Sequence, residues 1–550
     1  MNLLLQIAVC APYPPKSNST LPFCIQNSTI PDSPPIFCFP LTNRSKLYKS
    51  VRTKKQHPVV NFAGPVAPLV PDVFSRVGFS SDHGNDTQFF TLNYGSPRPF
   101  DFYDSLQPGQ MCNQIPGSMY FTRKDALSRY IQAMQSANPQ LDFAIIPRSY
   151  NLPKDLELLQ SLNNQSNSND MNNNYQMNND QLLTNNANNQ QIIKDNQQIT
   201  NNITNNQQTN NQQTNKVNNW FIYKPVLSAR GENLKLIHKT ELEKITGETA
   251  ATVQEYTEDV LLIHKRKFDL RVYFLITSVD PYVVYIYNEG IARFASEDYQ
   301  NVTFKNRNDL RMHLTNFAVN KGHKSKIQLK QSMTSVLSYI DKHPELIAEG
   351  EDSVKHELQE KEHIKDRIFQ NIQNALTKAL IATYTPMLHK AKECDNIYKF
   401  PRRFFGYYGA DIILDKKGNA KILEINASPS LNTDSDEDEQ IKTEFLEEIL
   451  NIIALNANID DQGNVIIPKR GHENPKIYQF NHSYEENKAI DIHNLTAYEK
   501  RVYQQITDEE SRLNKFQRIL PDAGWFEDMS NLNGLVRSLI SLNKEIKDVN

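Results

Sequence analysis

Cysteine is scarce in this sequence, with five residues among 550. They stand at Cys10, Cys24, Cys38, Cys112 and Cys394, and no two of them form a CxxC pair. Disulfide frameworks and thiolate metal clusters both depend on paired, closely spaced cysteines, so the spacing argues against either. We expect reduced thiols in a cytoplasmic protein.

An excess of charge of one sign is also missing. Lys and Arg number 60 against 63 Asp and Glu, which gives a formal net charge of -3. General nucleic-acid binders are usually strongly basic, so we expect no nucleic-acid partner. The apolar run Leu3 to Ala11 resembles part of a secretion signal but lacks basic residues before it. No later run reaches the length of a membrane span, and we expect no membrane partner.

The most informative stretch that is present runs from Tyr407 to Leu431. Two β-rich apolar runs flank Asp415 to Asn419, whose Gly and Asn suit a tight turn, so the stretch predicts a β-hairpin. Turning the chain brings Asp411 on one strand near Glu424 and Asn426 on the other. Two carboxylates and an amide oxygen suit Mg²⁺ when phosphates and water complete its shell. The alternative is a surface hairpin with solvated acids.

Two further segments carry candidate chemistry. Lys224 ends a predicted strand, and Arg230-Gly231 lie in the following loop, a pattern that suits a phosphate clamp. In the strand Phe268 to Leu275, Asp269 and Arg271 share one face. Charges inside a core-forming sheet are costly unless they are paired or meet a ligand, so we expect either an ion pair or a functional site.

Polar segments interrupt the globular pattern. Residues 12 to 60 are rich in Pro, Ser and Asn, and Asn43 to His57 within them has six Lys or Arg and no acid. That stretch is either a solvated charge run or an arm that attracts an acidic partner. Residues 163 to 219 are dominated by Asn and Gln and have almost nothing to bury, so we expect a disordered insertion.

Several motifs occur together in a characteristic order. They are KP...SARG, VQEY, RKFDLRVYFLITS, ARFAS, HLTNFAVNK and GADIILD...LEINASPSL. Through them the chain resembles the tubulin-tyrosine-ligase-like family of ATP-grasp ligases, and most of all its polyglutamylases, for which SARG is typical. The resemblance runs from about Cys112 to about Leu455 and continues weakly into EESRLNKFQRILP.

The resemblance implies an α+β, ATP-grasp fold with three domains. The expected segments are a flexible leader (1–60), an N-terminal domain (61–142), a central domain (143–266) that contains the insertion, a C-terminal domain with the magnesium and catalytic site (267–456), and a helical extension (457–550).

The resemblance also implies roles for individual residues. ATP would be held by Lys224, Arg230, Gly231, Gln254, Glu255, Tyr256, Thr257, Lys267, Asp269, Thr315 and Asn316. Arg293 and Lys321 would hold the carboxylate of the incoming amino acid. Mg²⁺ would be held by Asp411, Glu424 and Asn426, and catalysis would depend on Lys224, Arg271, Asp411 and Glu424.

The implied activity is ATP-dependent addition of glutamate to tubulin tails through an acyl phosphate, with ATP and Mg²⁺ as cofactors. Free glutamate and microtubules would be the partners of a monomeric enzyme in the cytoplasm and cytoskeleton, including the cilium or basal body. The acidic tails would meet the basic leader, Arg402 and Arg403. Two alternatives stay open: a glycylase of the same fold, and a microtubule-binding protein without catalysis, favoured by Glu232, Asn233 and Glu255.

Overall fold

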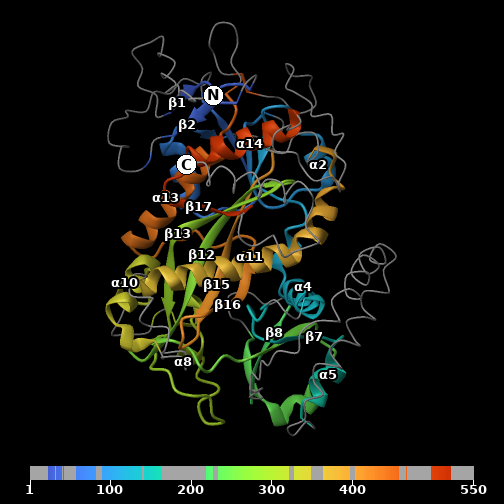
Figure 1. Cartoon of the computed structure of the whole chain (residues 1–550), viewed down its shortest axis with the longest axis vertical. Helices are drawn as coiled ribbons and strands as arrows, with labels where there is room; N and C mark the ends of the chain where they lie inside the picture. The colour runs from blue at the N-terminus through green and yellow to red at the C-terminus, as the bar shows by residue number, and fades with distance from the viewer. Residues whose placement is uncertain are drawn as a thin grey trace, which may run out of the picture.

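The computed structural model describes residues 23–30, 33–39, 41, 57–81, 89–138, 142–163, 219–226, 233–320, 322, 328–347, 363–396, 403–457, 466–467 and 497–521. Helices and β-sheets alternate along these segments, consistent with the α+β expectation. Figure 1 shows a large central sheet with smaller sheets above and below it.

The central sheet carries most of the core. Its strands follow the order β14, β13, β12, β15, β16, while β11 pairs with β12 and β17 pairs with β13. Their bounds are β11 Leu262–Ile263, β12 Arg266–Val279, β13 Tyr282–Phe294, β14 Lys330–Ser332, β15 Gly406–Leu414, β16 Ala420–Asn426 and β17 Phe516–Leu520. The second half of β12 reads as an almost continuous apolar run because both faces of the sheet are covered.

Helices cover both faces of this sheet. On one face α11 (Ile364–Ala391) crosses the strands, as Figure 1 shows, and buries Ile368, Ile372 and Leu376 in the core it shares with them. The same core includes α4 (Lys124–Ala137) and α10 (Met333–Lys342). On the other face α13 (Asp436–Ile452) packs Phe445 against Tyr273, with ring centroids 4.8 Å apart.

The predicted hairpin is confirmed as β15 and β16. Asp415 closes the turn because its carboxylate accepts hydrogen bonds from the backbone amides of Lys417, at 2.9 Å, and Asn419, at 2.8 Å. Gly418 has φ of +81°, a backbone conformation that side-chain-bearing residues rarely adopt. The turn sets the register of the residues next to it, and a β-bulge at Leu423 then shifts the pairing so that Asp411 faces Glu424.

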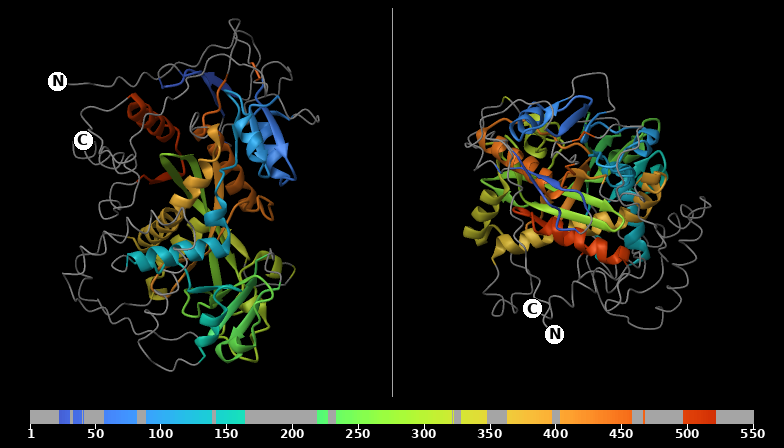
Figure 2. Two further views of the ribbon diagram at one scale, coloured as in Figure 1. Left: turned by 90° about the vertical axis from the view of Figure 1, so that its right-hand side faces the viewer. Right: turned by 90° about the horizontal axis from the view of Figure 1, so that it is seen from above.

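Two four-stranded sheets complete the body, one at each end of the molecule (Figure 2). The N-terminal sheet is parallel, in the order β4, β3, β5, β6. The other sheet is antiparallel, in the order β7, β10, β8, β9. Their strands are β3 Val59–Ala63, β4 Ser80–Ser81, β5 Leu92–Gly95, β6 Met111–Cys112, β7 Ser149–Leu152, β8 Trp220–Pro225, β9 Lys235–His238 and β10 Ala251–Glu255.

Shorter helices connect these elements. They are α1 Leu69–Arg76, α2 Phe100–Asp104, α3 Met119–Thr122, α5 Leu156–Ser161, α8 Leu310–His313, α9 Phe317–Asn320 and α14 Ala497–Glu510, with 3-10 turns at Lys239–Lys244 and Pro344–Leu346. Among the described residues, no helix has both the length and the apolar character needed to cross a membrane.

The expectation of a flexible leader is wrong for part of its range. β1 (Cys24–Gln26) and β2 (Ile36–Cys38) pair and dock on the end of α13, where the amide of Phe37 donates to the carbonyl of Leu455 at 2.9 Å. Phe23 and Phe37 pack edge to face at 5.4 Å within the second core. Buried phenylalanines therefore order a stretch whose polar composition suggested none. The basic stretch before His57 lies outside the described residues.

The expected helical extension is only partly helical. After α14 the chain forms β17, which pairs antiparallel with β13 and so becomes part of the central sheet. Glu509 fixes this return, because its buried carboxylate accepts hydrogen bonds from Thr277 at 2.8 Å and Tyr285 at 2.9 Å. The Asn-rich segment 164–218 lies outside the described residues. Its ends attach to α5 and β8, which belong to the lobe of the antiparallel four-stranded sheet.

Candidate active site

A cavity of about 220 Å³ lies between the antiparallel four-stranded sheet and the central sheet. Its walls come from β8, β10, β12, β13, β15 and β16, together with α4 and the loop around Thr315. The lining residues with ionisable side chains most relevant here are Lys124, Lys224, Lys267, Arg293, Glu255, Asp269, Asp411 and Glu424. Most of the residues proposed from the sequence therefore meet in one place.

The hairpin brings the three proposed metal ligands together. Asp411 and Glu424 are register partners across β15 and β16, and Asn426 faces Gly409 two residues along. The Nδ2 atom of Asn426 lies 3.4 Å from Oε1 of Glu424. All three side chains line the cavity. No cluster of three or more His, Cys, Asp or Glu side chains suited to a metal occurs among the described residues.

Buried ion pairs hold the floor of the cavity. Arg271 binds both carboxylate oxygens of Asp411, with Nη2 3.0 Å from Oδ2. Arg293 binds Asp269 through two hydrogen bonds, at 2.7 and 2.6 Å, and also lies 2.8 Å from Asp411. Thr315 donates to Asp269 at 2.7 Å. The charges on β12 thus pair across strands, which was one of the two expectations for Asp269 and Arg271.

This network sets the charge state of Asp411. Burial alone would raise the pKa of its carboxyl, but the guanidinium groups of Arg271 and Arg293 outweigh burial and hold that pKa well below its usual value. Asp411 is therefore ionised at neutral pH. Arg271 itself lies behind Asp411 and is not among the described residues that line the cavity, so it acts through that carboxylate.

Two buried lysines that face the cavity have pKa values below the usual value for a lysine. Burial lowers the pKa of Lys224 to about 8 and that of Lys267 to about 7. Lys224 Nζ donates to Oε1 of Gln254 at 2.6 Å, and Gln254 Nε2 donates to Oγ of Ser149 at 3.0 Å. Lys267 Nζ lies 3.3 Å from the carbonyl oxygen of Thr257. Both ammonium groups lack a direct carboxylate partner among the described residues, so an anionic ligand would stabilise them.

The part of the cavity wall around residues 254–257 is more apolar than the part that carries the ion pairs. The side chain of Gln254 is used to position Lys224, while Tyr256 lies under Lys267, whose Nζ is 3.9 Å from the ring centroid. Aliphatic side chains also line the cavity, including Ile222, Leu314 and Ile413. Apolar walls of this kind suit a flat heterocyclic ring.

Several predicted residues are not placed in the site. Arg230, Gly231 and Lys321 lie outside the described residues, as does Arg402. Arg403 was expected to meet an acidic partner, and that expectation is wrong. It is buried, and its Nη1 donates to the carbonyl of Leu106 at 2.7 Å, so it binds the segment between α2 and β6 instead.

Two basic residues near the site were missed. Lys124 of α4 reaches the cavity, with Nζ 3.2 Å from Oε2 of Glu424, although 300 positions separate them in the chain. Lys330 is the register partner of Arg293, and its Nζ lies 2.9 Å from Asp438 and 4.4 Å from the ring of Phe317. Their basic character was visible in the sequence, but nothing local linked either residue to its partner.

Charge balance decides what the cavity can hold. Four cations and four carboxylates line it, with Arg271 behind them. Asp411 and Glu424 already have cationic neighbours, so a divalent cation alone would meet a site that is electrically satisfied. A cation that arrives with a polyphosphate fits better, because the phosphates would pair with Lys224 and Lys267 while the metal takes the oxygens of the hairpin.

Comparisons with known proteins show which family the chain resembles in sequence. The family model described as "Tubulin-tyrosine ligase family" matches residues 104–172 and 159–462. A "Probable beta-tubulin polyglutamylase" of Tetrahymena thermophila is 27% identical over 487 residues, which is 85% of this chain and 34% of the relative. "Tubulin polyglutamylase TTLL7" of Homo sapiens is 25% identical over 518 residues, 90% of this chain and 51% of the relative.

The "Tubulin polyglutamylase TTLL6" of Mus musculus is 28% identical over 351 residues, 63% of this chain and 34% of the relative. The chain thus spans about a third to a half of the length of these relatives. The family match covers well over half of the chain and includes every strand that lines the cavity. The chain belongs to the tubulin-tyrosine ligase family.

Proposed function

We propose that this protein is an ATP-grasp ligase that uses ATP to join glutamate to side-chain carboxylates in tubulin tails. The observation that carries the proposal is the cavity in which two buried lysines of lowered pKa face the carboxylates of the hairpin. The relatives named as tubulin polyglutamylases support the choice of substrate. Such a substrate would associate the protein with microtubules of the cytoskeleton, including those of cilia.

The apolar part of the cavity wall and the part that carries the two lysines suit the two ends of a nucleotide. The adenine would lie against the apolar side chains that line the cavity beside Tyr256, with Thr315 and Asn316 near the sugar. The phosphates would extend toward Lys224 and Lys267, where their negative charge would restore the protonated state of both lysines. Gln254 and Ser149 would keep Lys224 oriented through the hydrogen bonds described above.

Asp411, Glu424 and Asn426 would hold Mg²⁺, with Arg271 keeping Asp411 ionised and in place. When bound, Mg²⁺ supplies positive charge to the phosphate oxygens during phosphoryl transfer. Lys124 lies next to Glu424, on the side from which α4 reaches the cavity. An ammonium group there would attract the acceptor carboxylate and favour its approach to the terminal phosphate.

The reaction then needs two transfers. The acceptor carboxylate oxygen attacks the terminal phosphorus of ATP, the bond to ADP breaks, and an acyl phosphate forms. The amine of free glutamate attacks the acyl carbon, the carbon–oxygen bond to phosphate breaks, and an amide bond results. Arg293 would hold the carboxylate of the incoming glutamate, and we propose that Lys330, its register partner, assists. Positioning and charge suffice, and no covalent bond to the protein is needed.

Incubating the purified full chain with microtubules, Mg-ATP and labelled glutamate or glycine tests the proposal. We expect glutamate incorporation, and Glu424→Gln should lower it by about 100-fold, since one charge at the transferring group is lost. Asp259→Asn is the matched control, because Asp259 pairs with Lys416 in the turn of the same hairpin and is largely exposed. Incorporation of glycine alone would indicate a glycylase. Mg-ATP binding without incorporation of either amino acid would refute the ligase proposal.

A further inference from the structure

Cys24 and Cys38 face each other across the small sheet at the N-terminal end of the described chain. They are register partners in the antiparallel pair of β1 and β2, although 14 positions separate them in the sequence. The spacing offers no CxxC signal, and the fold alone brings the two thiols together. Cys24 is exposed and Cys38 is half-buried, so an oxidant in solution can reach the pair.

The backbone geometry suits a covalent link between the two sulfurs. The amide of Phe37 donates away from β1 to Leu455, so its neighbours Ile36 and Cys38 turn their backbone groups toward β1. Cys24 and Cys38 are therefore a hydrogen-bonded pair, whose Cα atoms lie about 5.5 Å apart in an antiparallel sheet. Disulfides span Cα separations of about 4.4 to 6.8 Å, and a hydrogen-bonded pair lies within that range.

The chemical state of the pair supports the same conclusion. A hydrogen bond from Cys38 lowers the pKa of the Cys24 thiol to about 7, while the same contact raises the pKa of Cys38. The exposed sulfur is therefore substantially thiolate at neutral pH, which is the nucleophilic form. Burial raises the pKa of Cys112 to about 12, so that cysteine is inert by comparison.

We propose that Cys24 and Cys38 form a peroxide-sensitive dithiol that closes reversibly to a disulfide. The Cys24 thiolate attacks one oxygen of hydrogen peroxide, the O–O bond breaks, and hydroxide leaves and takes up a proton to become water. The sulfenic acid on Cys24 is then attacked by the sulfur of Cys38. The S–O bond breaks, a second water leaves with the thiol proton, and the S–S bond forms. Two thiols and one peroxide give one disulfide and two waters, and a dithiol reductant reverses the change.

The disulfide would fix the conformation of the segment from residue 24 to residue 38, which lies near residues of α13 and α14. Phe39 donates through its amide to Oδ1 of Asn451 at 2.8 Å, and Thr29 hydrogen-bonds to Asp508 near the end of α14. Asp508 in turn pairs with Arg512 at 2.7 Å. The disulfide would keep residues 24 to 38 on this platform. β1 and β2 lie near the top of Figure 1, whereas β16 and β8, which line the cavity, lie below the middle of the molecule.

Treating the full chain with hydrogen peroxide, followed by alkylation and peptide mass mapping, tests the proposal. We expect loss of two alkylatable thiols and a peptide pair linking positions 24 and 38, about 2 Da lighter than the sum of the reduced peptides. Dithiothreitol should restore both thiols. Single substitutions Cys24→Ser and Cys38→Ser should each abolish the linked pair.

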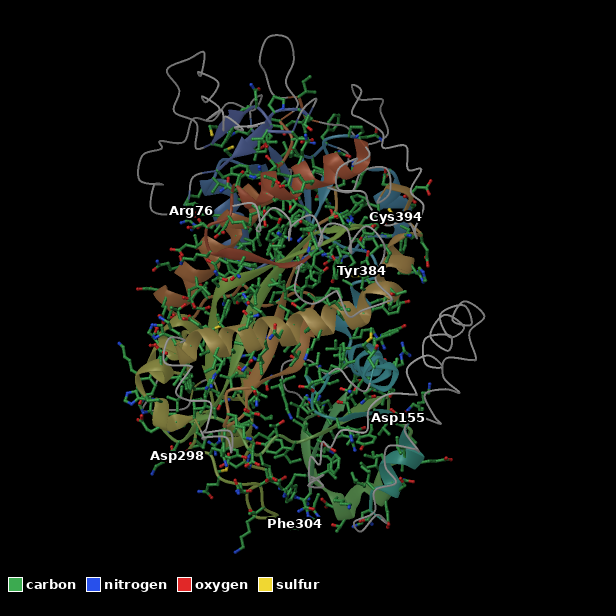
Figure 3. All side chains as sticks on the ribbon, viewed as in Figure 1. Arg76, Asp155, Asp298, Phe304, Tyr384 and Cys394 are labelled. Atoms are coloured by element: carbon green, nitrogen blue, oxygen red, sulfur yellow. The ribbon has the colours of Figure 1, made fainter. Side chains whose placement is uncertain are left out.

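Two variants serve as matched controls. Cys394→Ser changes a buried cysteine that Figure 3 places beside the end of α11, away from β1 and β2, and it should leave the product unchanged. Cys10→Ser tests the one cysteine outside the described residues and should also have no effect. Pairing of Cys24 with Cys10, a disulfide between two chains, or oxidation of Cys24 to sulfinic acid without a linked peptide would each overturn the proposal.

Discussion

Binding of Mg-ATP should draw protons from solution, because the two lysines that would meet its phosphates are partly neutral in the free protein. Burial places the pKa of Lys224 at about 8 and that of Lys267 at about 7. At pH 7.5 about three quarters of Lys224 and about one quarter of Lys267 are then protonated. If the phosphates return both groups to full protonation, binding takes up about one proton per nucleotide.

The sign of the pH dependence follows from the same values. Because the pKa of each lysine is higher in the complex than in the free protein, affinity is greatest at low pH and falls as pH rises through 7 and then 8. In the free protein, the protonated fraction of Lys224 multiplied by that of Lys267 falls by about 20-fold between pH 6 and pH 8. The dissociation constant of Mg-ATP should therefore rise by about that factor. At pH 6 proton uptake should be close to zero, since both lysines already carry their protons.

Calorimetric titrations in buffers of different ionisation enthalpy measure this uptake directly. Saturating Mg²⁺ keeps the nucleotide in one form, and Lys267→Met is the matched variant, which should retain only the quarter of a proton that Lys224 contributes. Release of protons, or no net transfer at pH 7.5, would refute the reasoning. An uptake in Lys267→Met equal to that of the unchanged protein would also refute it.

Three further predictions concern single side chains. Glu509→Ala leaves the buried hydroxyls of Thr277 and Tyr285 without their acceptor, and we expect the free energy of unfolding in urea to fall by about 3 kcal/mol. Arg293→Lys loses the bidentate hydrogen bonds from Arg293 to the carboxylate of Asp269, and glutamate incorporation should fall by about 100-fold. Lys124→Met should lower kcat by at least about tenfold while the urea midpoint stays within error, because the side chain is only half-buried.

Each of these variants has a counterpart that should change little. Glu393→Ala breaks an exposed pair with Lys390 at 2.6 Å. Arg76→Lys lies in α1, which contributes no residue to the cavity lining; Figure 3 labels Arg76 in the upper part of the molecule. Lys416→Met removes an exposed lysine in the turn of the hairpin. Equal losses in variant and counterpart would mean that the effect is general destabilisation, and would contradict the role assigned to the residue.

The parts of the site that could be predicted from the sequence are those fixed by local geometry. The hairpin brings Asp411 near Glu424, and alternation along β12 placed Asp269 and Arg271 on one face. The β-bulge at Leu423, which makes Asp411 and Glu424 direct partners, could not be predicted from the sequence. The partner of Asp269 could not be read, because it comes from β13 through a pairing that depends on the whole sheet. Lys124 was equally hidden, since α4 meets the hairpin only after the domains have assembled.

The order of the N-terminal segment could not be predicted from its composition either, because it depends on tertiary contacts. A polar stretch with three phenylalanines looks unable to fold, yet those rings complete a core built by α1, α13 and the central sheet. Gln254 was predicted to help hold ATP, and in the structure its side chain positions Lys224, a tertiary partner that no periodicity encodes.

The position of β17 has a consequence for how the chain is made. The long strand β13 is complete once residue 294 has been synthesised, but the segment that pairs along Val284 to Tyr287 arrives more than 200 residues later. Until then that stretch of β13 presents bare amide and carbonyl groups to any extended peptide in its vicinity. A ribosome carrying this nascent chain should therefore recruit chaperones during that interval, and truncation before Phe516 should yield aggregates.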